Sequence, residues 1–387
     1  MSVTPVRIPM YDLRGEYLSM RPAIDAAIRR VLESGTLTMG PEPRAFEEEF
    51  ARYCHARHAV GVGSGSAAVH LALLACGVGP GDEVITVPNT DIPTTMAISH
   101  CGASIVWVDV DPRTFNMAPE RIPEKITRRT KALLVVHLFG HPADMDPIMA
   151  VARNEGLRVI EDAALATGAE YRGRKVGAIG DIGCFSLAPT KILGATGDAG
   201  VITTDDEDLA ARIRVLRNYG HDLSMDDHEG LLAGVRAWTL VAEGFNERLD
   251  AVHAAVLRVK LPTLDERIAR RRHIARLYAE LLRGLDVVLP YEDPAVRHAY
   301  RAYPILVRGR DHVRDHLARR GIATQAYYTP LLHLQPVYRH LGRGVGSFPV
   351  AESVAERLVC LPIFPSMTEE QVREVAAAVR ECVPPAA

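Results

Sequence analysis

A regular alternation of strand-like and helix-like segments between residues 59 and 204 constrains the fold most. Short apolar runs predict strands, and longer segments with helical spacing separate them. Strands that alternate with helices form a mainly parallel sheet with helices on both faces. The predicted strands are residues 59–63, 84–88, 104–109, 132–138, 157–161, 182–187 and 199–204. We therefore expect an α/β protein built on a seven-stranded, mainly parallel sheet.

Helical segments flank this region on both sides. Before it, apolar residues from Ile24 to Leu32 have helical spacing, and Gly35 supplies a stop. Helices are also predicted at residues 206–217, 250–284, 311–320 and 368–382, and a strand at residues 303–307. At about 100–200 residues per domain, a chain of 387 residues favours two domains. The predicted parts are an N-terminal arm (1–15), a large domain (16–249), connecting helices (250–285) and a small C-terminal α+β domain (286–387).

Charge and hydropathy exclude several classes of partner. The net charge of −3 is near balance, so no nucleic-acid or membrane partner is expected. No apolar run approaches the ~18 residues of a membrane span. The six cysteines are scattered, without a CxxC pair or a histidine spacing suited to zinc, so no metal site is predicted. Free buried thiols suit a reducing compartment, and we expect a cytoplasmic protein.

One lysine, Lys191, lies in the loop between the last two predicted strands, together with Pro189, Gly194 and Gly197. A crossover between parallel strands needs roughly 10–12 residues or more including its helix, so these two strands are expected to be antiparallel. A solvated loop lysine is the ordinary interpretation, because most lysines are exposed. A catalytic role for Lys191 depends on what else the fold brings beside it.

Two other segments follow predicted strands, where open α/β sheets bind ligands. Residues 63–66 read Gly-Ser-Gly-Ser and lead into a helix, whose free N–H groups would hold a phosphate, although such turns also occur for structural reasons. Asp162 ends another strand and is either a helix N-cap or a partner for a protonated pyridine nitrogen. A lysine amine, a phosphate site that Ser186 could join, and this aspartate are what pyridoxal phosphate requires.

At these residues the chain resembles the DegT-type sugar aminotransferases. That family shares the fold of aspartate aminotransferase, which is fold type I of the pyridoxal-phosphate-dependent transferases. The resemblance covers nearly the whole chain, and several blocks occur in the family's order. These blocks are GPEPRAFEEEFARY, GSGSAAVHLAL, GPGDEVITVP, VDVDPRTFNM, VHLFGHPADMDPI, VIEDAA, DIGCFSLAPTK, RNYG, GFNERLDAVHAAVL, HLQPVY, FPVAE and VCLP.

The resemblance implies a role for particular residues toward the cofactor, pyridoxal 5'-phosphate (PLP). Lys191 would form the Schiff base with PLP, and Asp162 would hold the pyridine nitrogen. The phosphate would be bound by the backbone N–H groups of Gly65, Ser66 and Ala67, by the Ser66 hydroxyl and by Ser186.

The resemblance also implies contacts beyond one subunit and beyond the cofactor. Asn246 matches an asparagine that reaches the phosphate of the neighbouring subunit's cofactor, which implies a homodimer with shared active sites. Tyr327, Tyr328 and His333 lie where relatives border the substrate cleft.

Three positions depart from the family's pattern. Leu165 stands where relatives usually have a glutamine, and Thr167 where a histidine often follows. Ile92 stands where relatives commonly place an aromatic ring that stacks on the cofactor; an aliphatic side chain covers a ring by dispersion but without the π contact. These departures predict an unusual subgroup, with an altered substrate.

The implied reaction moves an amino group from glutamate or glutamine to a keto sugar, most simply a nucleotide-linked one, through the pyridoxamine form (PMP). The related dehydratase branch is disfavoured, because it has a histidine where this chain has Lys191. Two alternatives stay open: a cyclitol ketone as acceptor, and a PLP-binding regulatory protein without turnover.

Overall fold

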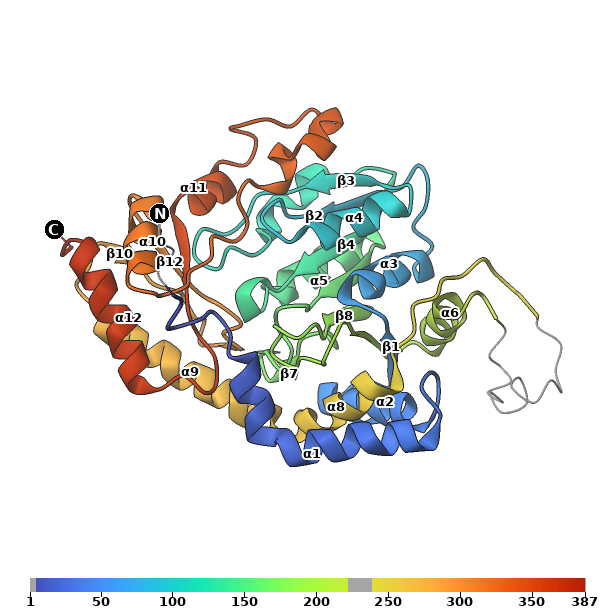
Figure 1. The fold of residues 1–387 in the computed structure, drawn as a ribbon. Coiled ribbons are helices and arrows are strands. Elements are labelled where there is room, and N and C mark those ends of the chain that lie inside the picture. The colour runs from blue at the N-terminus through green and yellow to red at the C-terminus, as the bar shows by residue number, and fades with distance from the viewer. Residues whose placement is uncertain (1–4, 222–238, 387) are drawn as a thin grey trace.

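The computed structural model describes residues 5–221 and 239–386, and its centre is one twisted sheet (Figure 1). The strand order is β1-β9-β8-β5-β4-β2-β3. Its strands are β1 (His58–Val62), β2 (Glu83–Thr86), β3 (Ser104–Trp107), β4 (Thr130–Val136), β5 (Arg158–Asp162), β8 (Ile182–Ser186) and β9 (Gly200–Thr204). Every predicted strand of this sheet is confirmed, and the residues that begin and end them shift by no more than two positions.

One strand of the sheet runs against the others. β9 lies between β1 and β8 and is antiparallel to both, whereas β8, β5, β4, β2 and β3 pair in parallel. The predicted antiparallel relation of the last two strands is therefore confirmed. Because β9 returns from the carboxyl edge, the loop that carries Lys191 and the turn after β1 lie at the same edge of the sheet.

Several helices begin at side chains that cap their free N–H groups. Ser64 caps α3 (Gly65–Ala75), Asp91 caps α4 (Ile92–His100), and Asp206 caps α6 (Glu207–Arg217). Other helices around the sheet are α1 (Leu13–Ser34), α2 (Pro41–Cys54), α5 (Met145–Glu155) and α8 (Ala251–Lys260). Figure 1 shows α1, α2 and α8 packed together below the sheet.

The segment predicted to be helical at residues 250–284 is helical but interrupted. It consists of α8, a short 3-10 turn η4 (Leu261–Thr263), and α9 (Leu264–Leu281). Pro262 lies at this break, and proline removes a helical hydrogen bond and clashes with the preceding turn. At the other end of the chain the predicted stop is confirmed, because α1 ends at Gly35 with φ +69°.

The C-terminal part has a three-stranded antiparallel sheet of its own, in the order β10-β12-β13. Its elements are β10 (Val287–Val288), β12 (Tyr303–Val307), α10 (Arg310–Arg319), α11 (Pro349–Arg357), β13 (Leu358–Leu361) and α12 (Glu369–Cys382). In a small separate sheet, β11 (Val296–Arg297) pairs with β6 (Glu170–Tyr171), which pairs with β7 (Arg174–Lys175). Further 3-10 turns are η1 (Pro119–Arg121), η2 (Pro123–Lys125), η3 (Leu138–Gly140), η5 (Leu332–Leu334) and η6 (Pro336–Leu341).

Buried side chains form two large hydrophobic clusters. One surrounds the seven-stranded sheet, and the other lies between β12, β13, α9, α10 and α12. The predicted domain bounds include residues 1–4, 222–238 and 387, which lie outside the described residues, and those bounds stay predictions.

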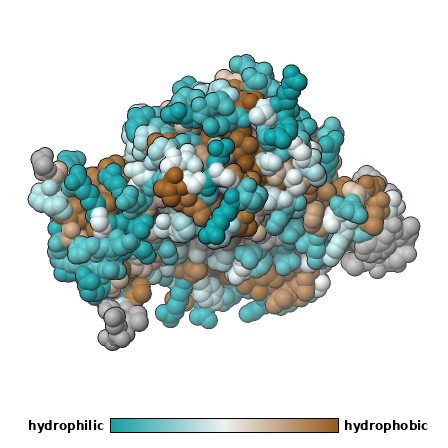
Figure 2. Space-filling view, turned by 90° about the horizontal axis from the view of Figure 1, so that it is seen from above, coloured by the Kyte–Doolittle hydropathy of each residue, from teal (hydrophilic) through white to brown (hydrophobic). Residues whose placement is uncertain are grey.

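The face in Figure 2 is mostly hydrophilic, with smaller apolar areas between the polar side chains. None of the helices in residues 5–221 and 239–386 is long and apolar enough to cross a membrane. The same residues contain no group of three or more His, Cys, Asp or Glu side chains placed to hold a metal ion.

Candidate active site

The loop between β8 and β9 holds Lys191 at the carboxyl edge of the sheet. Backbone hydrogen bonds close the loop on itself: the N–H groups of Lys191 and Ala195 donate to the carbonyls of Ala188 and Leu187, at 2.9 and 2.8 Å. Gly194 is required there, because a Cβ atom would lie 2.5 Å from the carbonyl oxygen of Pro189. The loop is therefore a fixed support for the lysine.

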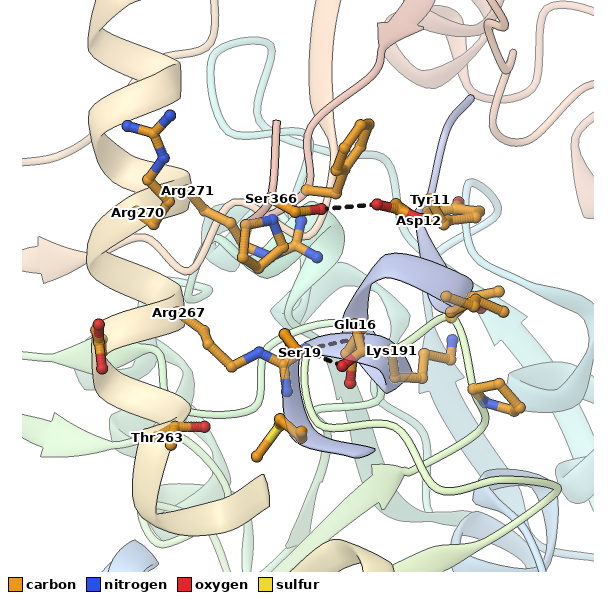
Figure 3. Close-up of a pocket in the computed structure, with 17 residues that line it drawn as sticks. Tyr11, Asp12, Glu16, Ser19, Lys191, Thr263, Arg267, Arg270, Arg271 and Ser366 are labelled. Carbon is orange, nitrogen blue, oxygen red and sulfur yellow. Dashed lines mark hydrogen bonds and ion pairs between the residues drawn. The ribbon is translucent and has the colours of Figure 1, made fainter. Parts of the chain in front are cut away.

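Lys191 borders two cavities. The larger has a volume of about 580 Å³, and Figure 3 shows arginines from α9 on one side of it and Lys191 on the other, with the Lys191 amine turned away from α9. These arginines already have partners: Arg267 forms an ion pair of 2.7 Å with Glu16, and Arg271 donates to the carbonyl oxygen of Ile363 at 2.7 Å. The smaller cavity, of about 160 Å³, is lined by Tyr11, Asp91, Phe139, Leu165, Thr190, Lys191, Arg301, Ala302, Tyr327 and Tyr328.

The surroundings of Lys191 lower the pKa of its amine from 10.5 to about 8. Burial is the largest cause, followed by the positive charge of Arg301, while Asp162 and Asp91 act in the opposite direction. With this pKa, roughly one amine in ten is uncharged at pH 7. Lys191 is therefore available as a nucleophile and as a proton acceptor near neutral pH.

Asp162 is a buried carboxyl group at the end of β5. The Thr94 hydroxyl donates to its Oδ2 at 2.8 Å, and the N–H of Ala164 donates to its Oδ1 at 3.2 Å. Burial raises the pKa of Asp162, although these hydrogen bonds and the charge of Lys191 oppose the rise. No helix follows in residues 163–171, so the N-cap alternative is wrong. A buried carboxyl group of this kind fits a protonated pyridine nitrogen.

The neighbouring carboxylate, Glu161, has a structural role that the sequence did not reveal. It is fully buried, accepts from His137 Nε2 at 2.9 Å, and accepts from the N–H groups of Gly177, Ile179 and Gly180 at 2.7–2.8 Å. These hydrogen bonds hold its pKa below the usual range against the effect of burial. Glu161 thereby fixes β5, and with it the position of Asp162.

The turn after β1 packs closely against the end of β8. A Cβ atom on Gly65 would lie 2.5 Å from Cβ of Ser186, so the predicted phosphate residues Gly65 and Ser186 are in contact. Ser66 is exposed at the start of α3. The N–H of Ala67 donates to Ser64 Oγ at 3.1 Å, so this predicted phosphate donor is already engaged by the N-cap of the helix.

Some of the other predicted residues line the smaller cavity, and the rest lie outside it. Tyr327 and Tyr328 line the smaller cavity with Lys191, and so does Leu165. Ile92 lies half-buried at the first position of α4, packed against the core and outside that lining. Asn246 is exposed and forms a backbone bridge with Asn218.

His333 is not at the cavity. It is buried, its Nε2 lies 3.1 Å from Glu352 Oε1, and its ring packs against Phe348 at 4.8 Å between centroids. Its prediction as a substrate residue gains no support from this placement. Thr167, which stands where relatives often have a histidine, is also buried.

Tyr11 and Arg301 are among the residues of the smaller cavity that sequence reasoning missed. Tyr11 precedes α1, and its hydroxyl is hydrogen-bonded to that of Tyr327. The guanidinium of Arg301 lies over the Tyr11 ring, 4.5 Å from its centroid. The only local signal is a charged residue just before the strand predicted at 303–307, and such a residue is usually solvated.

A cavity lysine with a lowered pKa, a buried aspartate and a glycine turn at one sheet edge define the class of pyridoxal-phosphate-dependent transferases. The chain belongs to the DegT/DnrJ/EryC1/StrS aminotransferase family, whose model matches residues 19–380. This confirms the resemblance that the sequence blocks indicated.

Individual relatives agree with this assignment. The chain is 43% identical to dTDP-3-amino-3,4,6-trideoxy-alpha-D-glucose transaminase of Streptomyces venezuelae over 376 residues, 97% of this chain and 96% of that protein. Its fold matches S. venezuelae DesV, solved in complex with a ketimine intermediate, with a TM-score of 0.92, 42% identity, and coverage of 98% and 99%. It also matches NtdA from Bacillus subtilis with bound cofactor PMP, with a TM-score of 0.84, 30% identity, and coverage of 93% and 82%.

Proposed function

We propose that this protein is a PLP-dependent aminotransferase that moves the amino group of glutamate or glutamine to a nucleotide-linked keto sugar. The observation that carries this proposal is the position of Lys191 and Asp162 at one sheet edge, next to the contact of Gly65 with Ser186. The acceptor class is supported by the transaminase of S. venezuelae, whose name specifies a dTDP-linked amino sugar.

The residues of the site fit PLP in three ways. The turn at Gly65 and the hydroxyls of Ser66 and Ser186 would bind its phosphate, Asp162 its ring nitrogen, and Lys191 its aldehyde carbon. When bound, PLP supplies an electron-withdrawing ring that takes up negative charge from the donor carbon.

The side chains around that ring have separate tasks. Asp162 keeps a proton at the ring nitrogen, because its buried carboxylate prefers a cationic partner. Lys191 Nζ would accept the proton that leaves the donor carbon in the first half-reaction and would donate a proton to the acceptor carbon in the second. An amine with a pKa of about 8 is suited to both steps. Leu165 and Tyr328 line the cavity beside Lys191 and help to exclude water.

The reaction can be tested directly on the purified protein. The protein should be yellow. Borohydride reduction should remove this absorbance and leave the cofactor covalently attached to Lys191. With glutamate, the protein should release 2-oxoglutarate in a single half-turnover. The exposed Lys131 provides a control, because Lys131→Ala should leave all three results unchanged, whereas Lys191→Ala abolishes them. A coloured protein that cannot perform the half-reaction with any amino donor would instead support a regulatory role.

The acceptor can be tested separately. The enzyme charged with an amino group should be discharged by a nucleotide-linked keto sugar and not by an inosose-type cyclitol ketone. Discharge by the cyclitol ketone alone would contradict the sugar-nucleotide assignment without affecting the aminotransferase reaction.

The active unit in this proposal is a homodimer in which Asn246 reaches the partner's cofactor phosphate. Asn246 is exposed and its backbone is held by the bridge to Asn218, which supports a role toward a second subunit. Mixing inactive Lys191→Ala and Asn246→Ala proteins should restore activity, because one site of each mixed dimer then has both residues. Random assortment predicts about a quarter of the wild-type activity. No restoration after subunit exchange would show that Asn246 acts within its own chain.

A further inference from the structure

Among the residues that the structure describes, Asp91 is the one acidic residue that lines the smaller cavity beside Lys191. It directly precedes α4, and its Oδ1 accepts from the N–H of Ile92 at 2.9 Å. Its second carboxylate oxygen, Oδ2, has no hydrogen-bond or ion-pair partner within residues 5–221 and 239–386. The residue is exposed, so Oδ2 is an acceptor that a ligand in the cavity can use.

The negative charge of Asp91 acts on other residues of this cavity. The N-terminus of α4 stabilises that charge, because the first N–H groups of a helix carry partial positive charge. Burial raises the pKa of Tyr328, and Asp91 is the next largest cause. At Lys191, burial and Arg301 lower the pKa of the amine, whereas Asp162 and Asp91 oppose that change. A ligand group beside the Lys191 amine therefore also lies in the field of Asp91.

The orientation of the amino donor follows from the difference in burial across the cavity. The reacting amino group must reach Lys191, which is half-buried, and Arg301 is buried with its guanidinium over the Tyr11 ring. Asp91 is the exposed charged residue of the lining. The opposite end of the donor, which is its side-chain group, therefore lies toward Asp91 in a cavity of only about 160 Å³.

Glutamate and glutamine, the two donors considered above, differ in this side-chain group alone. Glutamate ends in a carboxylate, which a second carboxylate repels. Glutamine ends in an uncharged amide with two N–H donors. A hydrogen bond from such an N–H to an ionised carboxylate is shorter and stronger than one between neutral groups. Asp91 thus favours the amide and disfavours the acid.

We propose that Asp91 selects glutamine over glutamate as the amino donor, by accepting an N–H of the side-chain amide on its free Oδ2. This inference rests on the proposed function and specifies its first substrate. The amide is recognised and does not react: the α-amino group stays on the enzyme, and glutamine leaves as the 2-oxo acid that still carries its amide.

The test compares the wild-type holoenzyme with Asp91→Asn. This variant removes the charge but keeps an oxygen that can cap α4, because asparagine is as good an N-cap as aspartate. The matched control is Asp206→Asn, since Asp206 caps α6 through its own carboxylate and does not line the cavity. Single half-turnovers are followed with L-glutamine and with L-glutamate through the loss of the yellow absorbance.

The second-order rate constant of the wild type should be at least about tenfold larger for glutamine than for glutamate, because facing like charges are strongly disfavoured. Asp91→Asn should react faster with glutamate and more slowly with glutamine, so that the ratio of the two constants falls toward one. Asp206→Asn should keep the wild-type ratio. The melting temperature of cofactor-free Asp91→Asn should equal that of the wild type, because the cap is retained.

Salt provides a readout that a capping role would not change. Asp91 is exposed, and raising the ionic strength from about 0.01 M to about 1 M shortens the Debye length from about 30 Å to about 3 Å. The preference of the wild type for glutamine should decrease over this range, whereas that of Asp91→Asn should not. An equal decrease in both proteins would assign the discrimination to other charges and overturn the inference.

Other results would overturn it as well. A wild type that prefers glutamate, or that does not distinguish the two donors, would exclude the selection by Asp91 while leaving the proposed function intact. An unchanged ratio in Asp91→Asn would assign the selection to another residue, and loss of the yellow colour in that variant would assign Asp91 to the cofactor. If the wild type reacts with no amino donor, the proposed function fails and this inference fails with it.

Discussion

Replacement of Lys191 by methionine should stabilise the cofactor-free protein at neutral pH. The pKa of the Lys191 amine is about 8 in the folded protein, against 10.5 in an unfolded chain. At about 1.4 kcal/mol per pKa unit, holding this amine charged in the folded state costs at most about 3.5 kcal/mol. The cost is an upper limit, because Lys191 is partly exposed in the cavity and solvent screens its charge.

The pH dependence of this effect has a definite sign. Between pH 8 and 10.5 the unfolded chain binds more protons than the folded protein at this residue, so wild-type stability rises with pH across that window. Below pH 8 the full cost is present, and above pH 10.5 it is absent. Lys191→Met removes the titrating group and should therefore be more stable than wild type at pH 7 but not at pH 10.5.

The measurement is denaturant unfolding of the cofactor-free proteins at both pH values. Lys131→Met is the matched control, because Lys131 is an exposed lysine on β4 and should show no difference that depends on pH. A Lys191→Met protein that is no more stable than wild type at pH 7, or whose gain is the same at pH 10.5, would refute the argument that burial and Arg301 depress this pKa.

Three further outcomes follow from the site. Asp162→Asn should lower the rate of the half-reaction at least about 100-fold, without lowering the neutral-pH stability of the cofactor-free protein, since the buried carboxyl group already has a raised pKa. Gly65→Ala should weaken PLP binding, measured by absorbance titration, because the new Cβ would meet Ser186 at 2.5 Å; Gly79→Ala is the control, with no atom within 4 Å. Glu161→Gln should destabilise the protein by about 3 kcal/mol in denaturant unfolding, because it breaks a buried network.

The large sheet could be predicted from the sequence because each of its strands is a local apolar run. The reversed direction of β9 also followed from local information, namely the length of the loop between it and β8. Strands of two residues, such as β6, β7 and β11, have no detectable pattern, because two residues cannot show a period. Their pairing is decided by the packing of segments that are far apart in the chain.

The candidate site was predictable where a functional group directly follows a strand. Lys191 and Asp162 were found in this way, and the structure places both at the carboxyl edge. Arg301 could not be found, because its burial depends on Tyr11, 290 positions earlier in the numbering, and on the carbonyl of Phe139. For His333, family position suggested a residue at the substrate cleft, and this stays a prediction; in the structure its ring is buried against Phe348.

The N-terminal arm has a consequence for how the protein is made in the cell. Ile8 pairs with Ile322, and the hydroxyl of Tyr11 is hydrogen-bonded to that of Tyr327, so this N-terminal segment is attached to one synthesised more than 300 residues later. A nascent chain on the ribosome thus has the lysine, the aspartate and the phosphate turn well before the cavity around them can close. We expect the cofactor to be captured only after translation ends, when the arm finds its partner near the C-terminus.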